Sequence, residues 1–452
     1  MKIIIFDDDP TGSQSVYGCP LLLNWDYQTL KKGIEDNSRL LFLLANTRAM
    51  TPQNAEERTR KICRSFKNMV KIKGFKIEDF LFVSRGDSTL RGHGVMEPEI
   101  INEELGPFDA TFHAPAFFEG GRTTIDGIHL LNGNPVHLTN FALDSTFGYS
   151  TSYLPDWIEE KSNGTILANN VCRISCHHLN AAIQSNNALE ELLKRLKTFS
   201  NNVSVVVDAQ NPDQLEIFAK AVIQLMGQKR FLFRSAASLI SAFAQLPENS
   251  LTSSKLAALR IRDQSLRLKS GLVMVGSHVQ LADQQLDILL KEPNCEGVEL
   301  PVEKINRILE ETSRDHLLNN LEFLLSKKLQ SILDSRKTPV LYTSRGEISF
   351  PSVSKRMFFG LQLAELMSRL AVTISSQIGY VISKGGITTQ IFLEKGLGLE
   401  IVKLKGQIMP GLSIVCPYNN EKFKPIPIIT FPGNLGNQET LLKVWKLMEN
   451  QV

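Results

Sequence analysis

Residues 2–14, KIIIFDDDPTGSQ, place three consecutive aspartates directly after a short apolar run. The run at residues 3–6 is typical of a strand buried in a parallel sheet, and the proline and glycine after the aspartates indicate a turn. Folding gains nothing from three clustered carboxylates, because like charges repel. Ligands of open α/β sheets bind outside the carboxyl ends of the strands, so we interpret Asp7, Asp8 and Asp9 as a candidate site. The alternative is a polar strand end with one aspartate that caps a helix.

The composition is that of a globular chain with two or three domains. Among 452 residues, 42% are hydrophobic and 21% are charged, with a net charge of +3. Charges of both signs are interspersed, so we expect no nucleic-acid or membrane partner. The N-terminal apolar run is too short for a signal peptide, and no run of about 18 apolar residues could span a membrane. Six cysteines in this length suggest no disulfide framework, which predicts a cytoplasmic protein.

One local cluster resembles half of a zinc site. The stretch 171–178, VCRISCHH, contains Cys172, Cys176, His177 and His178. No second cysteine pair of matching spacing follows, and VCRISC alternates as a strand does. We therefore favour the strand interpretation over zinc.

Apolar runs alternate with helical patterns along the whole chain, which predicts an α/β protein with two domains, largely parallel sheets and a cleft between the domains. A helix is expected to start at Thr51, a good N-cap, with Pro52 in its first position. Arg48 then lies at the carboxyl end of the preceding strand. The runs read as strands are residues 3–6, 40–47, 80–84, 110–116, 203–209, 272–277, 339–344, 379–386, 399–404 and 412–417.

A domain boundary is expected near residues 245–270, where the polar, turn-rich PENSLTSSK precedes a charged helical stretch. The predicted domains are 1–250 and 265–452. No aspartate follows Asp334 in the sequence. Any carboxylate chemistry that needs aspartate must therefore come from the N-terminal half.

A second cluster, VSRGDSTLRGHG at residues 83–94, lies just past a predicted strand. Arginine presents a rigid fork that matches a carboxylate, while hydroxyls and an aspartate can bind sugar hydroxyls. The glycines allow a ligand to approach the backbone closely. With Arg48, the cluster describes a pocket for a small polyhydroxy acid; a charged surface loop with internal salt bridges is the alternative. Its candidate residues are Asp87, Ser88, Thr89 and Arg91.

A third stretch, HAPAFFEGGRTT at residues 113–124, could form a loop over this pocket through Glu119–Arg122, or a simple turn. Since no HxxxH or HxH pattern supports a metal, we interpret His113, His129 and His137 as structural.

Three stretches in the second half resemble anion-binding loops. They are GSH at residues 276–278, GYVISKGGITTQIFLE at 379–394 and TFPGNLGNQETL at 430–441. A glycine turn into a helix N-terminus offers backbone N–H donors and a partial positive charge. The P-loop and Rossmann fingerprints are absent. Each loop alone could be a turn, but three in one domain favour a nucleotide.

Together these motifs resemble the four-carbon acid sugar kinase family over nearly the whole chain. DDDPTGSQ is similar to its N-terminal acid-Thr-Gly motif, SRGDSTLRGH to its sugar-acid motif and APAFFEGGRTT to its PAF-GGR segment. GSH, SKGGITT and FPGNLGNQETL are similar to its nucleotide-binding elements. The resemblance implies an N-terminal sugar-acid domain, a C-terminal ATP domain and phosphorylation of a C4 acid such as threonate, erythronate or an oxo-tetronate.

Carried over by motif, the implied substrate contacts are Asp8 or Asp9, Arg48, Asp87, Ser88, Thr89 and Arg91. The implied nucleotide contacts are Ser277, Gly385, Gly386, Gly433, Asn434 and Gly436. Two departures stand out. DDDPTG replaces a two-acid form, and Asn437 with Gln438 replace residues that are commonly acidic, which puts a metal role of that segment in doubt.

Phosphoryl transfer needs positioned phosphates and a base for the attacking hydroxyl. We expect Asp87 or Asp9 to be that base, with Asp8 next. Mg²⁺ would be carried mainly by ATP and water, since magnesium takes only one or two protein carboxylates. Such a carboxylate would be Glu347 or an N-domain aspartate that reaches across a closed cleft. The sequence does not decide the oligomeric state, and a homo-oligomer is one of the alternatives.

Two alternatives remain. A haloacid-dehalogenase-type phosphatase is suggested by Asp7-x-Asp9 after a strand, with Ser344 and Lys384 as further elements. In that family an acidic pair follows the lysine, and here no aspartate follows it. The other is a two-lobed sugar-acid sensor without activity, against which the phosphate-type loops argue.

Overall fold

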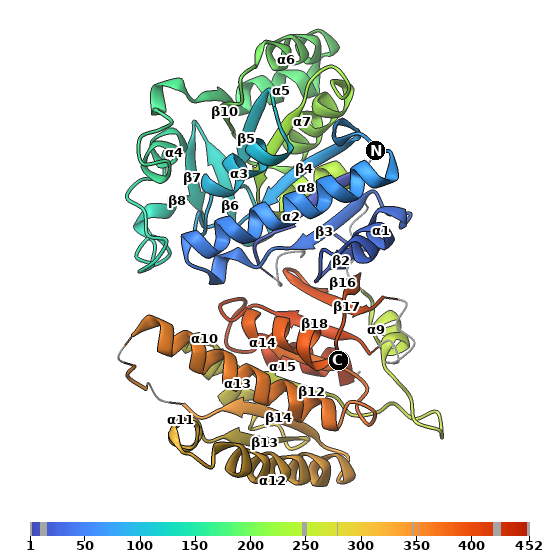
Figure 1. Cartoon of the computed structure of the whole chain (residues 1–452). Helices are drawn as coiled ribbons and strands as arrows, with labels where there is room; N and C mark the ends of the chain where they lie inside the picture. The colour runs from blue at the N-terminus through green and yellow to red at the C-terminus, as the bar shows by residue number, and fades with distance from the viewer. Residues whose placement is uncertain are drawn as a thin grey trace. The chain divides into compact units, whose positions relative to one another are not determined.

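The structure is a computed structural model that describes residues 2–9, 16–245, 251–277, 279–345, 348–350, 352–418 and 426–449. Residues 10–14 of the first motif, His278 of the GSH stretch and Glu347 lie outside these ranges. The chain divides into two compact units, Met1–Glu248 and Asn249–Val452 (Figure 1). Each unit is a layered α/β structure in which parallel strands predominate.

The first unit contains a sheet whose strands follow the order β2-β3-β1-β4-β11-β5-β10-β9, and every neighbouring pair is parallel. A small antiparallel sheet, β6-β7-β8, is formed by residues that lie between β5 and β9 in the sequence. The main strands are β1 (Lys2–Asp7), β2 (Pro20–Leu22), β3 (Leu40–Leu44), β4 (Phe80–Arg85), β5 (Ala110–Ala114), β9 (Cys172–Ile174), β10 (Val203–Val207) and β11 (Phe231–Ser235). The small sheet is formed by β6 (Arg122–Ile125), β7 (Ile128–Leu131) and β8 (Asn134–Pro135).

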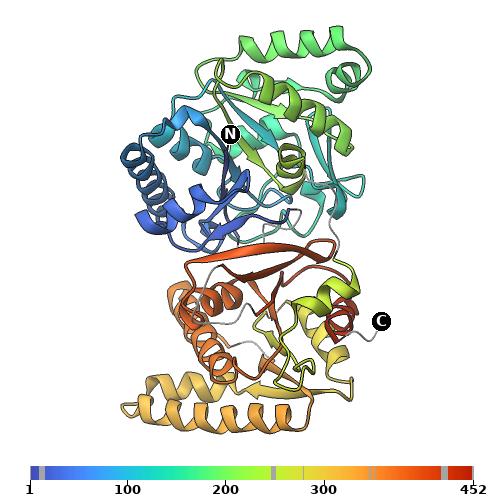
Figure 2. The ribbon, with the colours of Figure 1, turned by 90° about the vertical axis from the view of Figure 1, so that its right-hand side faces the viewer.

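Helices cover both faces of the main sheet, with α1, α2 and α3 in contact on one face and α5 to α8 on the other (Figure 2). Both faces of the strands are therefore buried, which explains their continuous apolar runs. The helices are α1 (Tyr27–Glu35), α2 (Pro52–Lys73), α3 (Met96–Leu105), α4 (Leu154–Lys161), α5 (Cys176–Gln184), α6 (Asn186–Thr198), α7 (Pro212–Gln224) and α8 (Ala237–Ala244), with the short 3₁₀ turns η1 (Thr47–Ala49) and η3 (Phe118–Gly120) near the site.

Helix α2 starts as the sequence predicts. Thr51 is the N-cap, its side chain accepts a hydrogen bond from the N–H of Asn54, and Pro52 occupies the first turn. The helix ends at Gly74, which has a φ of 73°. Capping at both ends holds the helix that directly follows Arg48.

The chain reverses its direction of travel across the sheet at β1. From β1 it proceeds to β2 and β3 on one side, and then crosses to β4 on the other side of β1. The point between β1 and β4 is thus a topological switch point, where the loops after adjacent strands separate and leave room for a ligand. Asp8 and Asp9 follow β1, and Gly86 and Asp87 follow β4.

The second unit has a mixed sheet in the order β13-β14-β12-β15-β18-β17-β16. Its first five strands in this order are parallel, and β17 pairs antiparallel with both β18 and β16. Its switch point lies between β12 and β15, because β12 leads to β13 and β14 on one side before β15 adds to the other. The strands are β12 (Leu272–Val275), β13 (Cys295–Leu300), β14 (Thr338–Thr343), β15 (Val381–Lys384), β16 (Ile401–Met409), β17 (Leu412–Pro417) and β18 (Ile428–Phe431).

The helices of the second unit also pack in two groups, α9, α10 and α15 in one and α11 to α14 in the other. Trp445 of α15 is buried, and its Nε1 donates a hydrogen bond to Oγ1 of Thr338 at 3.0 Å. The helices are α9 (Ser253–Leu259), α10 (Gln280–Leu289), α11 (Val302–Glu310), α12 (Arg314–Asp334), α13 (Val353–Thr373), α14 (Gly386–Ile391) and α15 (Thr440–Glu449), with the π-helical turn η6 (Phe392–Gly396) after α14.

The α/β prediction with largely parallel sheets is confirmed. The runs at 399–404 and 412–417 are strands, but they form an antiparallel hairpin in which Met409 pairs with Leu412. Only Pro410 and Gly411 lie between these two residues, and so short a loop cannot return the chain for parallel pairing. Strands β2, β6, β7, β8, β11, β13 and β18 were not predicted. Of these, β11 matters most, because it carries an arginine of the candidate site.

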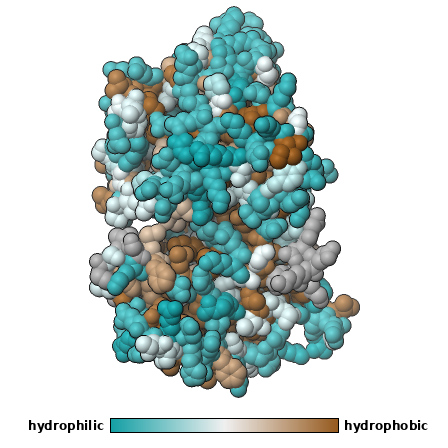
Figure 3. Space-filling view, viewed as in Figure 1, coloured by the Kyte–Doolittle hydropathy of each residue, from teal (hydrophilic) through white to brown (hydrophobic). Residues whose placement is uncertain are grey.

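No helix in the described ranges is long and apolar enough to cross a membrane. The face drawn in Figure 3 is mainly hydrophilic, with apolar residues scattered over it.

Candidate functional site

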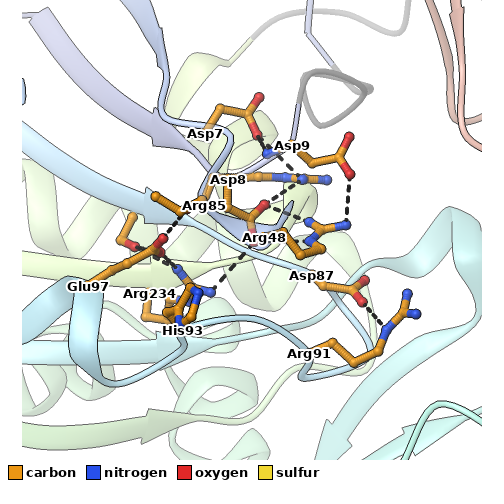
Figure 4. A network of polar contacts seen from close by, with 12 residues as sticks. Asp7, Asp8, Asp9, Arg48, Arg85, Asp87, Arg91, His93, Glu97 and Arg234 are labelled. Atoms are coloured by element: carbon orange, nitrogen blue, oxygen red, sulfur yellow. Dashed lines mark hydrogen bonds and ion pairs between the residues drawn. The ribbon is translucent and has the colours of Figure 1, made fainter. Parts of the chain in front are cut away.

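Asp8 is the centre of the polar cluster at the carboxyl end of β1 (Figure 4). Its carboxylate is almost fully buried and meets three arginines. Arg48 is closest, with Nη2 2.6 Å from Oδ1 and Nε 3.2 Å from Oδ2. Arg85, at the end of β4, lies 3.4 Å from Oδ1, and Arg234, on β11, lies 3.8 Å from Oδ2. Contacts with three cations fix the orientation of this buried carboxylate.

Asp9 shares Arg48 with Asp8. Its Oδ2 lies 3.2 Å from Nη1 of Arg48, so one guanidinium joins two consecutive carboxylates. The side chain of Asp9 is 21% exposed, whereas that of Asp8 is 1% exposed. Asp9 is therefore the more accessible of the two to a ligand.

Asp7 is the most perturbed carboxylate of the cluster. Burial raises its pKa to about 7, and the nearby charges of Asp8 and Asp9 act in the same direction against the opposing charge of Arg85. Oδ1 lies 3.4 Å from Nη1 of Arg85, while Oδ2 is buried and has no hydrogen-bond partner among the described residues. The sequence indicates Asp7 as a member of the cluster, but its raised pKa depends on burial, which the sequence does not show.

Asp87 sits in a tight turn directly after β4. Its carboxylate accepts hydrogen bonds from Oγ1 of Thr89 at 2.5 Å and from Nε of Arg91 at 2.8 Å. Burial favours the neutral acid, but the charges of Arg48 and Arg91 and these hydrogen bonds outweigh it, so the pKa of Asp87 lies well below its usual range. Asp87 is thus a fixed anion and hydrogen-bond acceptor more than a proton acceptor.

Side chains from other segments bind the backbone carbonyls of the same turn. The Ser88 carbonyl lies 2.8 Å from Nε2 of His129, and the Thr89 carbonyl accepts a hydrogen bond from the hydroxyl of Tyr149 at 2.7 Å. Gly92 follows with a φ of +97°, and a β-carbon there would lie 3.2 Å from Oδ2 of Asp8. The turn after β4 therefore approaches the β1 cluster closely at Gly92.

Two arginines face Asp87 from different elements. Arg91 lies over the ring of Phe141 at 4.9 Å, and its Nη1 lies 3.8 Å from Oδ2 of Asp144. Arg122 follows the turn η3, and its charge interacts with Asp87. The segment with Glu119 and Arg122 thus brings a cation toward the site, although nothing in the sequence distinguished it from a simple turn.

A small pocket opens next to Asp87 and Arg91. His113, Trp157, Arg234 and Ser235 contribute to its lining. Arg234 is fixed by Glu97 and by the Ser84 hydroxyl, to which its Nη1 donates at 2.7 Å. Burial and the charge of Arg234 lower the pKa of His113 to about 3, so its ring is neutral.

Several polar atoms around the pocket lack a partner in the described ranges. They are both ring nitrogens of His113, Nε1 of Trp157 and Oγ of Ser235. Buried polar groups without partners are rare in folded proteins, so these atoms suit a ligand with hydroxyl groups or ordered water.

The loops predicted to bind a nucleotide meet at the switch point of the second unit. Ser277 follows β12, Gly385 follows β15 and Gly433 follows β18, which are neighbouring strands. A β-carbon on Gly433 would lie 2.5 Å from Oγ of Ser277, and one on Gly385 would lie 3.4 Å from the Ser277 nitrogen. Gly385 has a φ of +124°, a conformation that favours glycine.

The remaining predicted nucleotide residues are placed differently. Gly386 opens the short helix α14 next to Gly385. Asn434 is exposed on the loop after β18. Gly436 has a φ of +87°, and its α-carbon packs where a β-carbon would clash with Thr440 of α15. Gly436 thus has a structural reason to be glycine that is independent of a ligand.

Lys384, the last residue of β15, is a buried cation in this region. Its Nζ donates hydrogen bonds to the carbonyls of Pro432 and Gly433 at 3.0 and 3.1 Å and lies 4.0 Å from the ring centre of Phe431. Burial lowers the pKa of Lys384 to about 7. The Lys384 side chain connects the loop after β18 to the end of β15. The sequence suggested a role for Lys384 only in the phosphatase alternative.

The zinc alternative finds no support in the described residues, which contain no group of three or more His, Cys, Asp or Glu side chains arranged around a common point. Cys172 lies on β9, and His178 instead caps α5 through Ser175. His129 and His137 are hydrogen-bonded structural residues, as expected. Ser344 accepts a hydrogen bond from the Val302 nitrogen, a structural role.

Comparison with known proteins agrees with this layout. Residues 3–243 match the model of a sugar-binding N-terminal domain, and residues 272–441 match that of a nucleotide-binding C-terminal domain. The chain therefore belongs to the family with this pair of domains, the architecture of the four-carbon acid sugar kinases.

One curated relative and two solved structures are similar over nearly their full length. A D-erythronate kinase of Heliobacterium modesticaldum (strain ATCC 51547 / Ice1) is 23% identical over 97% of this chain and 95% of its own. A Salmonella typhimurium LT2 protein, described provisionally as a tRNA synthase, has a TM-score of 0.66 at 16% identity, with 98% of both chains covered. Haemophilus influenzae protein HI1011 has a TM-score of 0.59 at 16% identity over 100% of this chain and 99% of its own. The two structures are similar in fold.

Proposed function

We propose that this protein is an ATP-dependent kinase that phosphorylates a hydroxyl of a four-carbon sugar acid of the erythronate, threonate or oxo-tetronate type. The observation that carries the proposal is that each of the two α/β units contains a candidate site at its own switch point. One contains buried carboxylates and arginines around Asp8 and Asp87, and the other contains the glycine loops around Ser277. The curated relative, a D-erythronate kinase, supports the substrate class.

The first unit offers what a small hydroxy acid needs. The fork of Arg91 and the nearby cation of Arg122 suit a carboxylate. Asp87, fixed as an anion, can accept a hydrogen bond from a sugar hydroxyl. Arg48 is paired with Asp8 and Asp9, so we propose that it orients these carboxylates rather than contacting the substrate, as the family resemblance implied.

For the base that accepts the hydroxyl proton, we favour Asp9 over Asp87, because the Asp9 side chain is the more exposed of the two. Two cations stabilise the anionic form of Asp87 and lower its affinity for a proton. Asp8 is enclosed by three arginines and nearly fully buried, so we assign it a positioning role. Asp9 is the more exposed carboxylate and lies next to the same arginine.

ATP and Mg²⁺ fit the second unit through its backbone rather than through acidic side chains. Gly433 approaches Ser277 so closely that a β-carbon would lie 2.5 Å from Oγ of Ser277, and Gly385 has a φ of +124° that favours glycine. The described residues contain no cluster of three potential metal ligands, so we propose that Mg²⁺ is held mainly by phosphate oxygens and water. The cleft between the domains, its closure and the cytoplasmic location stay predictions.

The test is a coupled assay of ADP release with purified full-length protein. It uses ATP with erythronate, threonate and oxo-tetronate stereoisomers, and the C5 analogues serve as controls. We expect ADP release with one C4 acid and a much lower rate with its C5 analogue, because polar pockets reject groups that leave their donors unpaired. Phosphate release from a sugar phosphate without ATP would instead support the phosphatase. Binding of a C4 acid without turnover would support the sensor.

A further inference from the structure

Arg345 follows β14, the neighbour of β12, and its guanidinium is only half used. Nη1 donates a hydrogen bond to the carbonyl of Ser277 at 2.8 Å and lies 2.9 Å from Oδ1 of Asp283 on α10. Nε and Nη2 are buried and have no hydrogen-bond partner among the described residues. These two nitrogens point their N–H groups along the same edge of the guanidinium, which forms the fork that binds carboxylates and phosphates in a bidentate manner.

This unused fork needs an explanation. An unpaired donor shielded from water costs free energy, and here two lie side by side on one cation. Burial lowers the pKa of Arg345, although Asp283, Asp287, Tyr342 and Glu299 act against this. None of these four groups accepts a hydrogen bond from Nε or Nη2. The side chain is 25% exposed as a whole, but its two fork nitrogens are shielded from water and no described residue accepts a hydrogen bond from them.

The position of Arg345 indicates what the fork receives. Its contact with the Ser277 carbonyl ties it to the residue that Gly385 and Gly433 approach. The strand order β14-β12-β15-β18 thus lines up Arg345, Ser277, Gly385 and Gly433 at adjacent carboxyl ends. Phosphate groups carry several oxygens that match a bidentate fork, and this is the switch point of the nucleotide-binding unit.

We propose that Arg345 is a nucleotide-binding residue whose Nε and Nη2 hold a phosphate group of the bound nucleotide. The inference rests on the proposed function, since it requires that the second unit binds a nucleotide. It adds a cation that no glycine-rich motif indicated. It also explains why the guanidinium is anchored through Nη1 alone, because that anchor leaves the fork edge open.

The test compares the affinity of the full-length protein for AMP, ADP and ATP by titration calorimetry. We expect Arg345→Gln to lower the affinity for those nucleotides whose phosphate reaches the fork by about 10- to 100-fold, the usual range for charge-assisted hydrogen bonds. Arg345→Lys keeps the charge and loses the fork, so a smaller but clear loss is expected. The shortest nucleotide that is affected identifies the phosphate. Arg307→Gln is the matched control, because Arg307 is 78% exposed in the same unit.

Asp283→Asn separates phosphate binding from a structural role of the ion pair. Removing Asp283 takes a negative charge away from the fork, so ATP affinity should stay equal or increase. An equal loss in Asp283→Asn and Arg345→Gln would overturn the inference, as would ATP affinities of both Arg345 variants within twofold of the wild type. If the wild type binds ATP in those cases, the proposed function still stands. If the wild type binds none of the nucleotides, both proposals fall.

Discussion

Oδ1 of Asp8 lies 2.6 Å from Nη2 of Arg48, and this contact joins the ends of two adjacent strands, β1 and β3. The same guanidinium also reaches Asp9. One arginine therefore sets the positions of two carboxylates at the switch point. Its removal should affect both the stability of the first unit and the geometry of its site.

Arg48→Ala should lower kcat/KM for the sugar acid by about 10² or more, since misplaced catalytic groups lose most of the advantage of orientation. Unfolding free energy should fall by about 1–3 kcal/mol, because Asp8 keeps Arg85 and Arg234 as partners and is not left unpaired. Steady-state kinetics and urea unfolding measure the two effects. Arg64→Ala is the control, because Arg64 is 67% exposed. This variant should change the unfolding free energy, and the activation free energy that corresponds to kcat/KM, by no more than about 0.5 kcal/mol each.

The two candidate bases should respond differently to loss of charge. Asp9→Asn should lower kcat by about 10² or more with ATP binding kept, as expected for the loss of a general base. Asp87→Asn should mainly raise KM for the sugar acid, because the substrate hydroxyl loses its carboxylate acceptor and Arg91 loses its charge partner. The opposite pattern, with kcat lost only in Asp87→Asn, would assign the base to Asp87.

Asp7 should make the first unit less stable as the pH rises from about 4 to 7. Its pKa is about 7 in the folded protein, so between those values the folded state keeps a proton that the unfolded state has lost. The loss amounts to about 1.4 kcal/mol per pH unit, or up to about 4 kcal/mol in total. Asp7→Asn removes this dependence.

Urea unfolding at pH 5 and pH 8 checks this expectation. Asp7→Asn should be more stable than the wild type at pH 8 and similar to it at pH 5. His113 acts in the opposite direction, because its pKa of about 3 destabilises the fold as the pH falls below about 6.5. The comparison of variant and wild type at each pH cancels the His113 contribution. Equal stability differences at both pH values would refute the assignment.

Lys384→Met should weaken ATP binding by about tenfold, since the loop after β18 loses its two hydrogen bonds to Nζ. The folded pKa of Lys384 is about 7, so the unfolded state binds an extra proton between pH 7 and 10.5. Wild-type stability should therefore rise with pH across that window, and the variant should show a smaller rise. Calorimetry and unfolding at pH 7 and 9 measure both effects. Lys395→Met, at an exposed lysine of the same unit, is the control.

Much of the fold followed from local pattern. The apolar runs at residues 3–6, 80–84 and 272–277 are strands, and the Thr51-Pro52 start of α2 is confirmed. These features depend on side chains close together in sequence, which is why the sequence reveals them. Strand β11 was missed, and with it Arg234, although the alternation of Phe231 and Phe233 was a usable signal.

The sequence by itself determined the class of protein and the segments that form its two candidate sites, because glycines, arginines and aspartates at strand ends carry a local signature. Only the tertiary structure decided which charges meet. Asp8 contacts arginines from the ends of β3, β4 and β11, and Arg345 contacts the loop after β12. Strand order in the sheet creates these pairs, and burial then sets their pKa values. Neither strand order nor burial can be read from residues that lie tens of positions apart in the chain.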